Sequence, residues 1–111
     1  MNDCIFCKLS KNELKTDKIY EDEKVYVIRD ISPKAPEHLL VIPHKHIEML
    51  SQLDHTDQAL MGHIMTSLNH YAKRVNLKDF RVIINNGKGA GQEVFHLHIH
   101  LLGGASQLPG F

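Results

Sequence analysis

Apolar residues recur with a helical period between residues 56 and 75. Eight of them lie three or four positions apart and form a broad stripe along one side of a helix: Leu60, Met61, Ile64, Met65, Leu68, Tyr71, Ala72 and Val75. Asp54 or Thr56 is placed to cap the N-terminus of this helix. The stripe is wide for a chain with so few other elements to cover it, so we expect part of it to form a subunit interface.

Shorter apolar runs predict strands over residues 19–21, 24–29, 38–43 and 80–85. A short helix is expected at residues 7–11, and loops at the proline-containing and glycine-rich segments between the strands. Short connections between the later strands favour antiparallel pairing. The expected fold class is α+β, an antiparallel sheet of about five strands with one long helix packed across it, in a single domain over residues 1–111.

Three histidines alternate with aliphatic residues near the C-terminus, where residues 95–102 read Phe-His-Leu-His-Ile-His-Leu-Leu. Successive side chains of a strand point to opposite faces, so we predict a strand with His96, His98 and His100 on one face. Folding requires polar residues on that face but not histidines, so the row points to chemistry. Metal binding, a merely polar surface and nucleophilic attack on an anionic centre are its three interpretations.

The segment before this strand favours nucleophilic attack. Residues 85–92 contain three glycines, whose backbone approaches a ligand closely and whose successive N–H groups can form an anion-binding concavity. His98 is the preferred nucleophile because it alone has a histidine two residues away on both sides, and neutral imidazole is nucleophilic near pH 7. The flanking rings of His96 and His100 would donate to the charge that develops on phosphate oxygens.

The chain carries no excess of positive charge. Lysine plus arginine and aspartate plus glutamate both total 13, so we expect neither nucleic acid nor a membrane as a partner, because both usually need a basic excess. No apolar run approaches the roughly 20 residues of a membrane span. Asp3 stands where a signal peptide has basic residues, and a cytoplasmic location is expected.

Cys4 and Cys7 are the two cysteines of the chain, and two residues separate them. A structural disulfide explains such a pair poorly in a reducing compartment, so metal binding and redox chemistry are the candidates. The pair makes half of a tetrahedral zinc site, which two histidines could complete. Two buried thiols without a metal are the alternative.

These segments together resemble the histidine-triad (HIT) superfamily, whose signature is His-x-His-x-His followed by two apolar residues, here residues 96–102. The resemblance is to the Hint branch, the purine nucleoside phosphoramidases, and it extends through residues 4–8, 30–36, 38–43 and 91–95. It implies a HIT-like fold and a homodimer with a sheet continuous across the interface. It also implies hydrolysis of P–N bonds in nucleoside 5′-phosphoramidates with an AMP or GMP moiety, and no organic cofactor.

The resemblance also implies roles for individual residues. His98 would form the covalent adenylyl or guanylyl intermediate, with His100 and His38 near the phosphate. Asp30 would accept hydrogen bonds from the ribose hydroxyl groups. The base would be lined by Ile5, Phe6, Ile28, Ile31 and Leu40, and the other nucleotide-binding residues would be Asn85, Gly91, Gln92 and Val94.

By resemblance to family members with the same cysteine pair, His46 and His96 would complete a structural zinc site with Cys4 and Cys7. The two roles expected for His96 then exclude each other, because a ring that ligates zinc is not available to contact phosphate. Two alternative functions stay open. A dinucleoside polyphosphate hydrolase uses the same triad, and a purine nucleotide-binding or scaffold module would need no catalysis.

Overall fold

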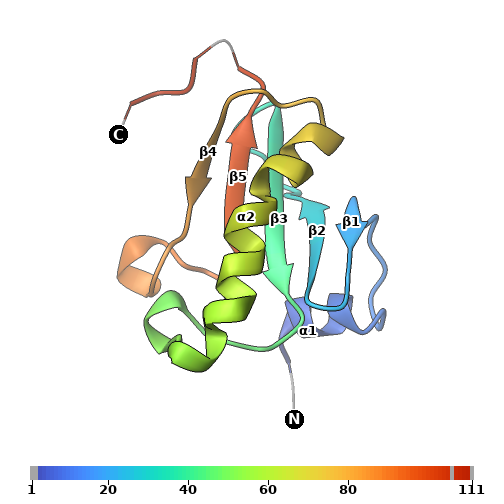
Figure 1. The fold of residues 1–111 in the computed structure, drawn as a ribbon, viewed down its shortest axis with the longest axis vertical. Helices are drawn as coiled ribbons and strands as arrows, with labels where there is room; N and C mark the ends of the chain where they lie inside the picture. The colour runs from blue at the N-terminus through green and yellow to red at the C-terminus, as the bar shows by residue number, and fades with distance from the viewer. Residues whose placement is uncertain (1–2, 106, 111) are drawn as a thin grey trace.

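The structure is a computed structural model, and it describes residues 3–105 and 107–110. A five-stranded sheet with strand order β1-β2-β3-β5-β4 forms its centre, and every neighbouring pair is antiparallel (Figure 1). The strands are β1 (Tyr20–Glu21), β2 (Val25–Arg29), β3 (Glu37–Pro43), β4 (Phe80–Ile83) and β5 (Ile99–Gly103). The helices are α1 (Ile5–Ser10) and α2 (Gln58–Arg74), with short 3-10 turns η1 (Leu50–Gln52), η2 (His55–Asp57) and η3 (Lys88–Ala90). The expected α+β class is confirmed.

The central strands are buried on both faces, because α2 crosses one face of the sheet and α1 lies against the other (Figure 1). Alternate residues of each strand therefore enter different apolar clusters. The cluster beneath α2 includes Val25, Val27, Leu39, Val41, Ile64, Leu68, Ile99 and Leu101. The cluster beneath α1 consists of Phe6, Leu9, Tyr26, Ile28, Leu40 and Ile42.

Helix α2 begins at Gln58, after η2, where Asp54 and Asp57 form a capping box. Seven of the eight residues of its apolar stripe belong to or pack against the cluster beneath α2, and only Met65, 41% exposed, does not. Leu60 and Met61 are only half-buried and Met65 is exposed, so the subunit interface expected on part of this stripe stays a prediction. Among the described residues, no helix is long and apolar enough to cross a membrane.

The histidine segment is a strand only in its second half. We predicted a strand from Phe95, but β5 begins at Ile99, so of the three histidines only His100 lies in it. Before that point the backbone leaves the ladder, and the Leu97 N–H donates to the carbonyl of Ile47 at 2.6 Å. The predicted alternation is nevertheless present, since Leu97 and Ile99 enter the cluster beneath α2 while the histidine side chains take the opposite side.

Candidate functional site

Four side chains from different parts of the chain meet on the α1 side of the sheet. The rings of His98 and His100 have centroids 5.1 Å apart, and His38 of β3 lies beside His100, with 2.8 Å between His38 Nε2 and His100 Nδ1. The register explains this contact, because Leu40 lies opposite His100 and makes His38 its diagonal neighbour. Asp30, in the loop before β3, places Oδ2 3.5 Å from His38 Nε2.

The ring of His98 has a defined orientation and proton position. Its Nδ1 lies 2.7 Å from the backbone carbonyl oxygen of His96. A carbonyl can only accept, so Nδ1 carries the proton of the neutral ring and Nε2 carries the lone pair. The rings of Phe6 and His98 pack edge to face, with 5.1 Å between their centroids. Nε2 is therefore the atom of this ring that can attack an electrophile.

The ring of His100 is neutral and has one unused polar atom. Burial, together with the neighbouring His98 and His38, lowers the pKa of His100 to about 4. Its Nε2 is buried and has no hydrogen-bond partner among the described residues. A buried polar atom without a partner costs free energy, so this atom is placed to meet a ligand group.

The predicted base-binding residues divide into a buried and an exposed group. Phe6, Ile28 and Leu40 are buried together beneath α1, and Val94 packs against them. Ile31, in the loop after Asp30, is 98% exposed, and Ile5 is 46% exposed. The buried group forms an apolar floor next to His98, while Ile31 has little to pack against in the structure.

The glycine-rich loop is shaped by Gln92. This side chain is buried, its oxygen accepts from the Gly87 N–H at 2.8 Å, and its amide group donates to the carbonyls of Glu48 and Val94. Both Gln92 donors are therefore occupied by backbone acceptors. Gly91 has φ +96°, a left-handed conformation that favours glycine. Asn85 is half-buried at the start of this loop.

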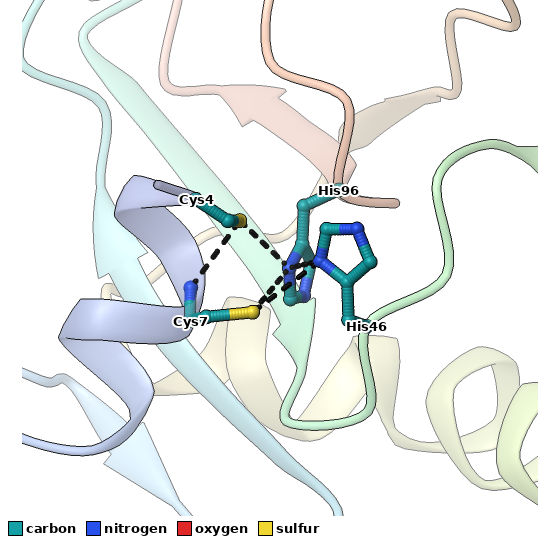
Figure 2. A group of neighbouring side chains, drawn as sticks. All are labelled: Cys4, Cys7, His46 and His96. Atoms are coloured by element: carbon teal, nitrogen blue, oxygen red, sulfur yellow. Dashed lines mark hydrogen bonds between the residues drawn. The ribbon is translucent and has the colours of Figure 1, made fainter. Parts of the chain in front are cut away.

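The side chains of four residues converge at one point: Cys4, the N-cap residue of α1, Cys7 within α1, His46 after β3 and His96 before β5 (Figure 2). The Nδ1 atom of His96 lies 3.1 Å from His46 Nδ1, 3.2 Å from Cys4 Sγ and 3.5 Å from Cys7 Sγ. A further 3.3 Å separates Cys7 Sγ from His46 Nδ1. The four residues predicted as metal ligands are thus brought together.

This cluster has the chemistry and spacing of a zinc site. Zinc bonds of about 2.0–2.1 Å to nitrogen and about 2.3 Å to sulfur give tetrahedral edges of about 3.4 Å between nitrogens and about 3.6 Å between nitrogen and sulfur. The distances around His96 fall within a few tenths of an ångström of these edges. Burial lowers the pKa of His96 to about 4, so its ring is neutral. Its Nε2 donates to the Pro43 carbonyl at 2.8 Å, which leaves the Nδ1 lone pair for a metal.

A second group, Asp30, His38 and His100, also has its ligand atoms within 4.8 Å of one another. Its hydrogen bonds disfavour a metal. The backbone N–H of Lys34 donates to His38 Nδ1 at 3.1 Å, so the proton of the neutral ring is on Nε2, the atom that faces the other two residues. A metal there would have to displace that proton, whereas His96 presents a lone pair to its cluster.

Sequence reasoning missed the backbone groups that orient these rings. The carbonyls of His96 and Pro43 and the amide of Lys34 each contact one ring nitrogen. Every residue has such groups, so no side-chain pattern could have singled them out. Only the path of the loops brings them to the imidazoles.

Residues 11–107 of the chain match the family model described as HIT domain. The chain is 45% identical over 104 residues to Protein HitA of Neisseria gonorrhoeae, and the aligned segment covers 93% of this chain and 97% of that protein. It is similar to a solved histidine triad protein from Clostridium difficile, with TM-score 0.93, 41% identity, and coverage of 100% of this chain and 97% of that one. A solved HIT family hydrolase from Legionella pneumophila gives TM-score 0.90, 38% identity, and coverage of 94% and 95%.

The lowered pKa of His100 predicts a loss of stability in acid. The folded pKa of about 4 lies below the ordinary 6.5, so between these values the unfolded chain binds more protons and stability falls as the pH falls. We expect the urea midpoint of the wild type to decrease between about pH 6.5 and about pH 4, and to decrease less in His100→Asn. His55→Asn, which removes an exposed imidazole, should keep the full decrease. An equal decrease in His100→Asn and wild type would contradict the assignment.

Proposed function

The chain belongs to the HIT domain family, and on that premise we propose that it hydrolyses the P–N bond of purine nucleoside 5′-phosphoramidates through a nucleotidyl intermediate on His98. The observation that carries the proposal is the hydrogen bond from His98 Nδ1 to the His96 carbonyl. It leaves Nε2 with its lone pair, as a nucleophile requires. The name HIT family hydrolase, given to the neighbour from Legionella pneumophila, supports the general reaction type.

The reaction proceeds in two displacements at phosphorus. His98 Nε2 attacks the α-phosphorus, the N–P bond to the ring forms, and the bond to the leaving amine breaks while the amine takes up a proton from solvent. Water then attacks the same phosphorus and releases a proton to solvent, the bond to His98 breaks, and the nucleoside monophosphate leaves. His100 Nε2 is placed to stabilise the charge on the phosphate oxygens, because it is buried and without a partner among the described residues.

The substrate would lie along the α1 side of the sheet. The apolar floor of Phe6, Ile28 and Leu40 suits a flat purine base beside the nucleophile. Asp30 is an acceptor for the ribose hydroxyl groups, since its Oδ1 already takes the Ser32 N–H and so fixes the carboxylate. Gln92 acts by holding the glycine-rich loop near the phosphate, since both of its amide donors are occupied.

Replacing the nucleophile should abolish turnover and spare binding. We expect His98→Ala to lower kcat for an adenosine phosphoramidate by at least about 10³-fold, because it removes the attacking lone pair of Nε2. AMP affinity, measured by calorimetry, should change little.

His55→Ala is the matched control, because it removes an exposed histidine outside the site and should keep wild-type turnover. Wild-type protein with no turnover above buffer would overturn the phosphoramidase proposal. Binding of AMP by such an inactive protein would favour a nucleotide-binding module, and turnover of a dinucleoside polyphosphate alone would favour that alternative hydrolase.

We also propose that Cys4, Cys7, His46 and His96 hold one structural zinc ion. Three atoms that can ligate a metal, two sulfurs and one nitrogen, lie within 3.5 Å of the single lone pair on His96 Nδ1. One shared proton cannot satisfy all three of these contacts. Zinc would supply no step of the reaction there. It would fasten α1 to the segments that precede β5 and follow β3.

Metal analysis of protein purified without chelator tests this site. We expect about one equivalent of zinc in the wild type and a large loss in His46→Asn, because a tetrahedral site needs all four ligands. His44→Asn removes an imidazole two residues away that bonds to Ser10 and the Asp22 backbone instead, and should keep the metal. Less than one-tenth of an equivalent in the wild type would exclude the zinc proposal.

We further propose a homodimer joined through β4. This strand lies at the edge of the sheet, and its Val82 and Ile83 are each 36% exposed. Such an edge offers unpaired backbone groups to a second copy of the chain. Sedimentation equilibrium at micromolar concentration should give the mass of a dimer, and Val82→Arg should shift the mass toward that of the monomer. A monomeric wild type would contradict the proposal.

A further inference from the structure

The backbone amide of Lys34 fixes the proton position of His38. The amide nitrogen lies 3.1 Å from His38 Nδ1, and a backbone N–H can only donate. His38 Nδ1 must therefore accept, and the proton of the neutral ring lies on Nε2. His38 is buried, and burial lowers its pKa, so the neutral ring is the form at neutral pH.

The proton on His38 Nε2 determines the tautomer of the neighbouring ring, that of His100. His38 Nε2 lies 2.8 Å from His100 Nδ1 and 3.5 Å from Asp30 Oδ2. Since Nε2 of His38 carries a proton, it donates to His100 Nδ1, which must accept. A proton on His100 Nδ1 would face the His38 proton across 2.8 Å. The proton of His100 therefore lies on Nε2, the buried atom without a partner among the described residues.

The loop that carries the amide is held in place by its own hydrogen bonds. The Asp30 N–H donates to the His38 carbonyl at 2.8 Å and closes the loop, and the Ser32 N–H donates to Asp30 Oδ1 at 2.9 Å. The Lys34 side chain is exposed, and its ammonium group donates to the Ser32 carbonyl at 3.3 Å. The backbone amide of Lys34 is thus the group that donates to His38.

We propose that the Lys34 backbone amide is a positioning group which, through His38, holds His100 in the Nε2–H tautomer and so presents one hydrogen-bond donor to an anionic phosphate oxygen of the ligand. The inference rests on the proposed function for the identity of that ligand, a nucleoside monophosphate group. The two rings then have opposite tautomers and different roles. His100 carries its proton on Nε2 and acts as the donor, whereas His98 carries its proton on Nδ1 and keeps the Nε2 lone pair of a nucleophile.

Nitrogen-15 NMR of the imidazole rings in the full chain tests the tautomers directly. In the wild type we expect His38 and His100 to show Nε2–H and His98 to show Nδ1–H, which serves as the internal reference. Addition of AMP should shift the Nε2–H signal of His100. An Nδ1–H tautomer at either His38 or His100, or AMP binding without that shift, would overturn the proposal.

Two substitutions at one position separate the amide from the side chain. Lys34→Ala keeps the N–H and should keep the tautomers of His38 and His100. Lys34→Pro removes the N–H and should populate Nδ1–H at His38 and, in consequence, at His100, with kcat lower than in Lys34→Ala by about 10-fold or more. A folded Lys34→Pro protein with unchanged tautomers would refute the role of the amide, and if it does not fold, the wild-type spectra decide.

The tautomers and the AMP shift are read without turnover. Failure of the phosphoramidase proposal would appear as the predicted spectra in a protein that hydrolyses no phosphoramidate. Failure of the positioning proposal would appear as the wrong tautomers in a protein that still does.

Discussion

The antiparallel register between β3 and β5 places His38 and His100 on one face of the sheet and buries the leucines beside them on the other. Leu39 lies opposite Leu101, and both enter the cluster beneath α2. Each fully buried leucine contributes roughly 1.5–3 kcal/mol of transfer free energy, and a slip of one residue would turn it to the other face. Burial of the apolar face therefore stabilises this register, and the register determines where the imidazoles lie.

Burial then decides the charge of these rings. It lowers the pKa of His38, His96 and His100, so each ring carries a single proton at neutral pH. With one proton for two nitrogens, a single contact to a backbone donor or acceptor settles which nitrogen is protonated. The Pro43 carbonyl makes this contact to His96 and the Lys34 amide makes it to His38, whose ring in turn contacts His100. Chemically identical side chains thereby acquire different roles.

The sequence predicts much of this fold but little of the detail that separates the histidines. Apolar periodicity is a property of side chains, and it identified α2 and the central strands, because burying those side chains drives them together. It failed at the start of β5, where a backbone contact from Leu97 to Ile47 ends the ladder before Ile99. It also could not predict that the side-chain amide group of Gln92 donates to backbone carbonyls. Both features depend on where loops run, and loop paths leave no periodic signal.

The ring and the backbone of His96 make different contacts, and these bear on whether it contacts the cysteine cluster or a phosphate. The ring is fully buried, with Nε2 donating to Pro43 and Nδ1 pointing into the cysteine cluster, so neither nitrogen reaches toward a phosphate. The carbonyl of the same residue accepts from His98 and orients its ring. The metal-type cluster and the ring of His98 are thus joined through one residue, whose side chain belongs to the cluster and whose backbone contacts His98. The rings of His98 and His100 lie on the α1 side of the sheet, and the backbone of His96 sets the orientation of the first of them.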